Sequence, residues 1–586
     1  MHDNSRTLMR RILARYAPTA GRLLDVGAYD VNGTYRQDVG ALEYTGCDVQ
    51  AGPNVDMVMT GPAAIPAESG AYDVVISGQT LEHAEDPRAL MVEMARVLRP
   101  GGLLVVIAPS TGALHRYPVD CWRILPDGMR ALGKAAGLRE LEITWSQVDP
   151  YRDVAGAWRK PGPDEPRLSV VTPTHNTQWL PEVADSLRAQ DFTGSWEWLI
   201  VPNNGAEIDA GQFDDLPVRV VPMGGEAKGV GAIKAFAFGQ ARGEIHVELD
   251  HDDLLTPHAL TTIDRAFTEH PEAVLAYSNS GEFWDGTDEP NTYDTRYGWL
   301  HRDREFYGRK FVELRGFPPS PAMMRHVNFA PNHVRAWWAD AYRAVGGHDA
   351  TLALADDHDL MCRLYVHGPA HWIDDCLYLY RCYEGQTWRQ SQGKPGSAAN
   401  TSQQVYLKHG RAMAEAWCRR DGLPMLDLGA AHNPQAGYVG VDRREAPGVN
   451  VVCDLDRDRL PYADSSVGLI RAVDFLEHLV NPVAVMNELY RVLAPGGWIL
   501  TATPSTDGRG ACMDPTHRTG WNSNSWWYYT QRRFAQYVPE ITCRFQVARL
   551  DNGYPSDWHR LHQIPYVYAD LIAIKGDIRL PGEVLI

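Results

Sequence analysis

An internal repeat constrains the fold of this 586-residue chain more than any other feature. Residues 81–111 and 476–506 share a Leu-Glu-His tripeptide, a helical pattern, a Pro-Gly-Gly turn, an apolar run and a final Pro-Ser-Thr. The histidine and the turn proline are 17 positions apart in both segments, which are related by a constant offset of 395. A period this long excludes a solenoid of short repeats. It predicts that one domain type occurs twice, with a different domain between the copies.

Upstream of each repeat, two short apolar runs end in acidic residues, and the first acid is followed by a glycine. These residues are Asp25, Gly27 and Asp48 in the first copy and Asp427, Gly429 and Asp442 in the last. Strands that alternate with helical stretches predict βαβ units and a mainly parallel sheet, whose ligands bind beyond the carboxyl ends of the strands. Such a glycine lets the backbone approach a ligand, and such an acid accepts hydrogen bonds from two ribose hydroxyls.

Through these residues and the Leu-Glu-His tripeptides, both outer segments resemble class I S-adenosylmethionine-dependent methyltransferases. The resemblance implies a Rossmann-like fold, S-adenosyl-L-methionine as the cofactor, and Asp25, Gly27, Asp48, Asp427, Gly429 and Asp442 as its binding residues. The family's first loop carries further glycines, where this chain has Tyr29 and Val31 in one copy and Ala431 and Asn433 in the other. Gly33 in a shifted loop, or a turn at His432-Asn433-Pro434, would replace them. This departure leaves an alternative open, in which an outer module is a non-catalytic binding domain.

The methyl group of a sulfonium is already activated, so a methyltransferase mainly aligns the acceptor with it. A hydroxyl acceptor also benefits from a general base. His83 and His478 follow the fourth expected strand of each copy and are the candidate bases, with a structural role in fixing that loop as the alternative. Residues 115–123, 514–518 and 526–529 mix aromatic and polar side chains, which suits the binding of sugar rings or the packing of a lid.

The stretch between the copies follows a Pro-rich linker, 159–166, and opens with a buried-strand pattern at 168–171. A later apolar run ends at Asp250-His251-Asp252-Asp253. Three acids at one strand end repel one another unless a cation compensates their charge. Oxygen ligands favour Mg²⁺ or Mn²⁺, so Asp250 and Asp252 are the candidate metal ligands.

Residues 168–383 resemble family 2 glycosyltransferases of the GT-A fold. The resemblance rests on Pro173-Thr174-His175-Asn176, Lys234, the acidic run 250–253, Gly346-Gly347-His348-Asp349 and Ala355-Asp356-Asp357-His358-Asp359-Leu360. It implies a nucleotide-sugar donor bound by Pro173, Thr174, Asn176, Asn203, Lys234 and Asp250. Asp357 would be the base that takes the acceptor proton, with Asp356 as its substitute; acids that stabilise a helix N-terminus are the competing explanation. The family usually has aspartates at Asn203-Asn204, so the nucleobase is bound differently or need not be uracil.

The net charge, the cysteines and the apolar runs limit the partners and the cellular location that we expect. The net charge of −18 disfavours nucleic-acid binding and weakens a further alternative, a glycosyltransferase that acts on modified DNA bases. Nine scattered cysteines without a C-x-x-C pair argue against a disulfide framework. No apolar run approaches the roughly 18 residues of a membrane span, and we expect a cytoplasmic protein.

The expected fold class is α/β in three domains, with boundaries at 1–158, 166–389 and 404–586 and a loop over 390–403. The leading hypothesis is a glycan-building enzyme of a bacterial surface polysaccharide or bacteriophage system. Its centre would transfer a sugar to a glycan or glycosylated acceptor, and one or both of its ends would methylate that sugar or its neighbour. Fusion of the domains would raise the effective concentration of the acceptor at each site.

Overall fold

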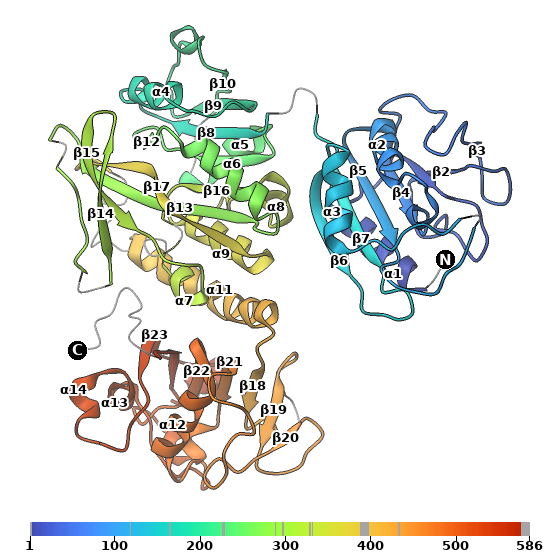
Figure 1. Ribbon diagram of the computed structural model, residues 1–586. Coiled ribbons are helices and arrows are strands. Elements are labelled where there is room, and N and C mark those ends of the chain that lie inside the picture. Colours follow the sequence, from blue (N-terminus) through green and yellow to red (C-terminus); the bar gives the residue numbers. More distant parts are fainter. Residues whose placement is uncertain are drawn as a thin grey trace. The chain divides into compact units, whose positions relative to one another are not determined.

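The computed structural model describes residues 3–117, 119–162, 166–225, 229–287, 289–295, 298–326, 330, 332–386, 398–431 and 434–575. The chain forms two compact units, Met1–Glu165 and Pro166–Ile586. Each unit has its own sheets (Figure 1). Each also has its own apolar clusters.

The first unit is built around a seven-stranded sheet in the order β3-β2-β1-β4-β5-β7-β6. Its strands are β1 (Arg22–Val26), β2 (Glu43–Asp48), β3 (Met57–Val58), β4 (Tyr72–Gly78), β5 (Leu98–Ala108), β6 (Arg139–Trp145) and β7 (Val154–Arg159). β1 is parallel to both β2 and β4, and the strand order reverses there. β7 runs antiparallel to both of its neighbours, β5 and β6. Ligands of open α/β sheets bind beyond the carboxyl ends at such a reversal.

Helices cover both faces of this sheet. α1 (Asp3–Tyr16) packs on one face, and α2 (Pro87–Val97) and α3 (Pro126–Ala135) pack on the other. Along β5, Leu103 and Val105 join the cluster of α1, whereas Leu104 and Val106 join that of α2 and α3. Because both faces are covered, the strands are continuous apolar runs rather than alternating ones.

The second unit begins with a ten-stranded sheet in the order β10-β9-β8-β11-β16-β13-β15-β14, with β17 beside β13 and β12 beside β17. Its strands are β8 (Leu168–Thr174), β9 (Trp196–Pro202), β10 (Val218–Val220), β11 (Ile245–Glu248), β12 (Leu254–Leu255), β13 (Leu275–Trp284), β14 (Leu300–Phe306), β15 (Arg309–Arg315), β16 (Arg335–Trp338) and β17 (Ala370–Cys382). The helices of this domain are α4 (Leu180–Arg188), α5 (Val230–Gln240), α6 (Ala259–Glu269), α7 (Pro321–Met324), α8 (Ala339–Ala344) and α9 (Asp356–His367).

The last domain repeats the topology of the first, with the order β20-β19-β18-β21-β22-β24-β23. Its strands are β18 (Met425–Leu428), β19 (Val439–Asp442), β20 (Val451–Val452), β21 (Val467–Val473), β22 (Leu493–Pro504), β23 (Phe545–Gly553) and β24 (Tyr566–Ala573). Its helices are α11 (Ala398–Asp421), α12 (Pro482–Val492), α13 (Trp527–Thr530), α14 (Arg532–Ala535) and α15 (Asp557–Leu561). The expected three-domain α/β architecture with a repeated Rossmann-like domain is confirmed.

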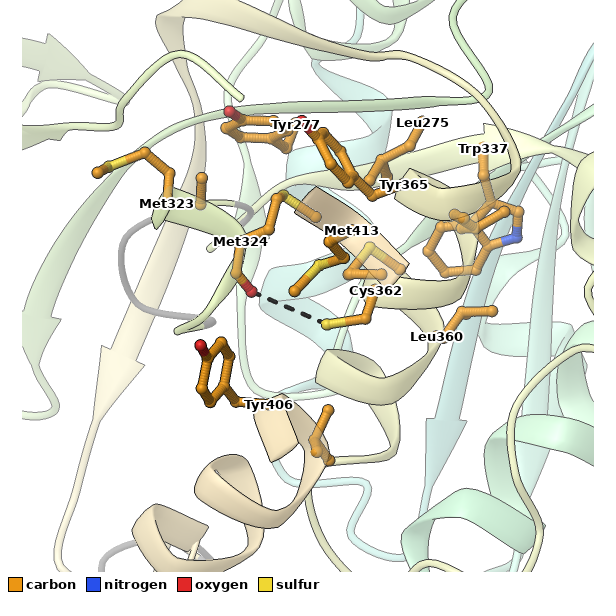
Figure 2. Packing of buried hydrophobic residues seen from close by; sticks show 14 of the residues in the cluster. Leu275, Tyr277, Met323, Met324, Trp337, Leu360, Cys362, Tyr365, Tyr406 and Met413 are labelled. Carbon is orange, nitrogen blue, oxygen red and sulfur yellow. Dashed lines mark hydrogen bonds between the residues drawn. The ribbon is translucent and has the colours of Figure 1, made fainter. Parts of the chain in front are cut away.

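Helix α11 joins the cores of the central and last domains. It precedes β18 as α1 precedes β1, but it is 24 residues long against 14. It packs along α9 and α7 of the central domain and against β21 of the last. Met413 and Tyr406 of α11 lie among Cys362 and Met324 (Figure 2), in a buried cluster that continues to Trp498 of β22. The two domains therefore share one apolar core.

The loop predicted over 390–403 is wrong in its last part, because α11 already begins at Ala398. Residues 390–397 lie outside the described residues. Polar composition favoured a loop, but burial of Val405 and Tyr406 against neighbouring elements favours the helix that carries them. Residue 404, the expected start of the third domain, lies inside this helix.

We expect Met413→Ala to lower the free energy of unfolding of the second unit by about 2–5 kcal/mol, because the side chain is fully buried and leaves a cavity in the shared core. Denaturant unfolding monitored by tryptophan fluorescence measures this. Leu407→Ala, at an exposed position of the same helix, is the matched control and should change stability by less than about 0.5 kcal/mol. Equal effects of the two substitutions would contradict a shared core.

Candidate functional sites

Strand pairing gathers the expected donor residues at one edge of the central sheet. β8 lies between β9 and β11 and is parallel to both, with Thr174 opposite Pro202 and Val171 opposite Glu248. Asn203 directly follows β9, and its amide donates to the carbonyl of Thr174 at 2.9 Å. Asp250 follows β11 at the same edge. Pro173 lies within β8, and the amide of Asn176 donates to Thr174 Oγ1 at 3.2 Å in the turn that follows.

In the acidic run after β11, Asp253 differs from Asp250 and Asp252 because hydrogen bonds hold its carboxylate against β17. Asp253 accepts hydrogen bonds from Tyr378 Oη at 2.8 Å and from the amide of Arg381 at 2.7 Å, which tie it to β17. Burial and the neighbouring Asp252 and Asp250 raise its pKa well above the ordinary value. Lys234 lies 3.6 Å from Asp250 Oδ1, and the phenol of Tyr383 is hydrogen-bonded to Asp252. The net negative charge of the run suits a bound cation.

A row of alternating charges connects Asp250 with Asp357. Lys234 of α5 forms an ion pair with Glu248 and lies 3.6 Å from Asp250 Oδ1. Arg335 of β16 places Nε 2.8 Å from Glu248 and Nη1 2.5 Å from Asp357 Oδ2. We call these five residues the charge ladder. Lys234, Glu248 and Arg335 are buried, so the ladder fixes the expected metal ligand and the expected base relative to each other.

The two candidate bases at the start of α9 have opposite environments. Burial opposes ionisation of Asp357, but Arg335 and Lys234 outweigh it and hold the pKa of this carboxyl well below the ordinary value. Asp356 is more deeply buried, with side-chain exposure of 4% against 24% for Asp357. Burial raises the pKa of Asp356 to about 7, and its Oδ2 lies 3.8 Å from Nε2 of buried His348. Asp357 is therefore the more accessible and the more fully ionised carboxylate.

The side-chain oxygen of Asn203 is an unused hydrogen-bond acceptor at the sheet edge where the nucleotide-sugar donor is expected. Its side chain is buried, and its Oδ1 makes no hydrogen bond in the structure, while Nδ2 makes only a long contact of 3.4 Å to the carbonyl of Val201. A buried carbonyl oxygen without a donor is costly. A ligand N–H, such as the imide of uracil, would satisfy it.

The two outer domains build their expected cofactor edges in the same way. Gly27 and Gly429 follow β1 and β18 with φ of +85° and +70°. Each donates its amide to the next strand, to Cys47 O at 2.8 Å and to Val441 O at 2.9 Å. A Cβ on Gly27 would lie 1.9 Å from Thr80 Oγ1, so no other residue fits there without rearrangement.

The acids after the second strands are held by the first loops. Asp48 Oδ2 accepts from the amide of Tyr29 at 3.1 Å, and Asp442 Oδ2 accepts from the amide of Ala431 at 3.2 Å. Each carboxylate keeps further lone pairs that can accept hydrogen bonds from a ligand. Asp30 of the first loop accepts from Gly33 N at 2.7 Å, and so turns this loop without the additional glycines. His432 and Asn433 lie outside the described residues.

The acids on the first strands are neutralised differently in the two copies. Asp25 accepts a hydrogen bond from Tyr44 Oη at 2.6 Å, and burial raises its pKa to about 7. Asp427 forms an ion pair with Arg471 at 2.7 Å. Arg471 lies on β21 and takes the place of Ile76 on β4. Both acids are almost completely buried, which suits support of the glycine turn.

His83 and His478 lie in short 3-10 helices, Leu81–His83 and Leu476–His478, directly after β4 and β21. The segments expected near the acceptor cover these turns. Cys121 N and Trp122 N donate to Glu82 O, and Arg518 N and Thr519 N donate to Glu477 O. Trp526 and Tyr529 belong to the apolar core, so packing accounts for them, whereas Trp122 and Tyr528 are exposed. Pro118 of the first segment lies outside the described residues.

Glu248 and Arg335 are absent from the site expected on sequence grounds. The sequence signal for Glu248 is that a charged residue stands within an apolar strand, β11, which is buried. Arg335 is far along the chain, and only the antiparallel pairing of β16 with β11 places it beside Glu248.

Comparison with protein-family models finds a match to the methyltransferase domain family at residues 32–106 and again at 426–501. Residues 169–329 match glycosyl transferase family 2. The chain carries a family 2 glycosyltransferase domain between two methyltransferase domains. Both domain types belong to transferases. Among the described residues, no helix combines the length and the apolarity that crossing a membrane requires.

Curated relatives extend beyond the region that they share with this chain. The O-antigen biosynthesis protein RfbC of Myxococcus xanthus is 26% identical over 372 residues, which are 58% of this chain and 27% of RfbC. Protein y4gI of Sinorhizobium fredii is 26% identical over 242 residues, 39% of this chain and 24% of y4gI. The chain thus spans about a quarter of the length of these relatives. Among solved structures, S. aureus TarS 1-349 with UDP-GlcNAc has a TM-score of 0.32 and 16% identity, covering 44% of this chain and 73% of TarS 1-349.

Replacing the carboxyl groups of Asp25 and Asp427 by amides should change the free energy of unfolding in opposite directions. The folded-state pKa of Asp25, about 7, exceeds its ordinary value of 3.8, so its contribution to stability is present at low pH and is lost as pH rises to about 7. We expect Asp25→Asn to stabilise the first unit by roughly 2–4 kcal/mol more at pH 8 than at pH 4. Urea unfolding of residues 1–165 at both pH values measures this.

Asp427→Asn is the matched comparison. It removes the partner of Arg471 and should destabilise the second unit at pH 8. A pH-independent effect of Asp25→Asn would show that the buried carboxyl of Asp25 does not titrate as expected.

Proposed function

We propose that the central domain transfers a sugar from a nucleotide-sugar donor to a glycan or glycosylated acceptor, and that the outer domains methylate the glycan with S-adenosyl-L-methionine. The charge ladder carries this proposal, since it couples the acidic strand end at Asp250 to the ionised carboxylate of Asp357. Leaving-group stabilisation and acceptor activation are the two tasks of glycosyl transfer, and the ladder holds one acid for each.

On the donor side, Asp250 and Asp252 would hold Mg²⁺ or Mn²⁺ together with the donor diphosphate. The bound cation supplies charge stabilisation for the leaving diphosphate. Lys234 counters the negative charge of Asp250 and keeps this carboxylate oriented. Asn203 Oδ1 would accept an N–H from the nucleobase, as a carboxylate would, so the amide at this position is compatible with uracil.

On the acceptor side, Asp357 would accept the proton of the attacking hydroxyl. Arg335 holds Asp357 in place through Nη1 and is itself held by Glu248. Asp356 points toward His348 in the interior, and its raised pKa keeps part of its population protonated near neutral pH. Asp357 is the carboxylate that an acceptor hydroxyl can reach, and on this ground we assign it, rather than Asp356, the role of base.

In the outer domains, Asp48 and Asp442 would bind the ribose hydroxyls of the cofactor, with Gly27 and Gly429 admitting it close to the backbone. The cofactor, when bound, supplies an activated methyl group. The protein's part is to orient the acceptor hydroxyl in line with the bond from the methyl carbon to sulfur.

The name of RfbC supports a polysaccharide as the product, since that relative is an O-antigen biosynthesis protein. The nine cysteines form no disulfide in the described residues, and we propose a cytoplasmic location, where thiols stay reduced.

Asp357→Asn should lower the turnover of sugar transfer by about 10²–10⁴-fold, because it removes the proton acceptor. Donor binding, measured by calorimetry with nucleotide-sugar and Mn²⁺, should change only a few-fold. Asp185→Asn, at an exposed position of α4, is the control and should leave both values unchanged. Loss of turnover in Asp356→Asn with normal turnover in Asp357→Asn would reverse the assignment.

Asp48→Ala and Asp442→Ala should each remove one of two S-adenosyl-L-methionine sites in calorimetry of the full chain, because each carboxylate serves the ribose of one site. Asp127→Ala, at an exposed position, should leave both sites intact. A stoichiometry of one in the wild type, insensitive to one of the two substitutions, would identify that domain as a non-catalytic binding domain.

A further inference from the structure

A carboxylate and two imidazoles converge next to the expected cofactor edge of the first domain. They belong to Glu82, His83 and His115, and one ligand atom from each lies within 4.8 Å of the other two. Glu82 and His83 come from the short helix after β4, and His115 comes from the segment after β5. The rings of His83 and His115 meet edge to face, with centroids 5.1 Å apart.

The last domain contains the same group of side chains. Glu477, His478 and His517 also place one ligand atom each within 4.8 Å of one another. The rings of His478 and His517 meet edge to face at 4.9 Å between centroids. We call the two groups the Glu-His-His clusters. They are the groups of this kind that the described part of the chain contains.

The glutamates of both clusters carry buried oxygens without hydrogen-bond donors. Glu82 has no exposed surface, and neither of its carboxylate oxygens accepts a hydrogen bond; Nε2 of His83 lies 3.8 Å from Oε1. Glu477 is 2% exposed; its Oε2 accepts from Thr503 Oγ1 at 2.6 Å, and its Oε1 accepts none. Burying such oxygens without a partner is expensive, and a cation between the three side chains removes this cost.

The histidines have their Nδ1 atoms directed at oxygen atoms of the protein. His83 Nδ1 lies 2.5 Å from Val119 O and His115 Nδ1 lies 3.2 Å from Ala113 O. In the last domain, His517 Nδ1 lies 3.0 Å from Ala511 O, and His478 Nδ1 lies 3.4 Å from Thr516 O. Donation from Nδ1 to a carbonyl leaves the Nε2 lone pair for a metal, which is the usual arrangement around histidine ligands.

Duplication of the sequence alone does not account for the two clusters. The second histidine of each cluster, His115 or His517, lies at a different distance along the chain from the backbone contact to the glutamate carbonyl that both copies share. His517 immediately precedes Arg518, whose amide donates to Glu477 O, whereas His115 lies several residues before Cys121, whose amide donates to Glu82 O. Different loop positions thus supply the third side chain to the same place in both domains.

We propose that each Glu-His-His cluster binds a divalent transition-metal ion whose open coordination positions take the acceptor hydroxyl. The metal-binding part stands on the clusters themselves, and the acceptor part rests on the methyl transfer proposed above. Two imidazoles and one carboxylate with open positions suit Zn²⁺ or Fe²⁺, whereas Mg²⁺ prefers oxygen ligands. The separation of 3.8 Å between His83 and Glu82 is close to the roughly 3.3 Å expected across a tetrahedral zinc ion.

A metal at this position gives His83 and His478 the role of ligands instead of general bases. The bound hydroxyl would lose its proton to solvent water, because the cation lowers the pKa of the hydroxyl. Its oxygen would then form a bond to the methyl carbon as the bond from that carbon to sulfur breaks, which leaves a neutral thioether.

The test is zinc calorimetry on the full chain, freed of any affinity tag, stripped with a chelator and held in excess Mg²⁺ to occupy oxygen-ligand sites. Wild type should bind two equivalents of Zn²⁺. His83→Ala and His517→Ala should each bind one, and the double variant should bind none. His559→Ala, a histidine outside both clusters, is the matched control and should bind two.

Glu82→Gln separates metal binding from folding. It retains the size of the side chain and removes the buried charge, so the metal-free protein should melt no lower than wild type, while the rise in melting temperature of the first unit on adding Zn²⁺ should disappear. Failure of the wild type to bind Zn²⁺, or zinc counts unchanged in His83→Ala and His517→Ala, overturns the metal sites.

Parallel titration with S-adenosyl-L-methionine keeps this result distinct from the proposed function. Binding of the cofactor without binding of Zn²⁺ overturns the metal sites and leaves methyl transfer standing. Binding of Zn²⁺ without the cofactor supports the metal sites and overturns methyl transfer.

Discussion

The buried carboxylate of Glu248 organises the central domain. It lies between Lys234 and Arg335, three charges that are almost completely removed from water. Removing one partner from such a group leaves an uncompensated buried charge and costs about 3–5 kcal/mol. Because these partners come from α5, β11 and β16, their attraction fixes three elements to one another. The outer ends of the charge ladder, Asp250 and Asp357, are then held at the sheet edge with little freedom.

The two methyltransferase domains show how one topology tolerates different electrostatic solutions. The acid on the first strand is paired with a phenol in one copy and with a guanidinium in the other, through Tyr44 and Arg471. The following glycine turn and the acid after the second strand keep the same backbone hydrogen bonds in both copies. Backbone hydrogen bonds thus preserve the geometry of this sheet edge, while the partner of the buried first-strand acid differs between the copies.

The last domain depends on its neighbour in a way that the first does not. Helix α1 packs on one face of the sheet within the first unit, whereas α11 also buries Tyr406 and Met413 against the glycosyltransferase domain. Asp359 lies on α9, two residues after Asp357. It accepts a hydrogen bond from His409 of α11 at 2.8 Å. The helix that carries the proposed base is therefore braced by the helix that begins the methyltransferase domain.

The sequence by itself determined the repeat, the α/β class and the strand-end positions of Asp48, Asp250, Asp442 and their neighbours. These depend on local patterns, since an apolar run followed by a glycine or an acid fixes a strand and its end. Only the tertiary structure decided which distant side chains meet there. Arg335 reaches Glu248 through antiparallel pairing, and His115 and His517 reach their glutamates through loop docking. Helix α11 replaces the last part of an expected loop because its apolar side chains are buried by two domains. Such contacts depend on long-range packing, which short-range periodicity does not encode.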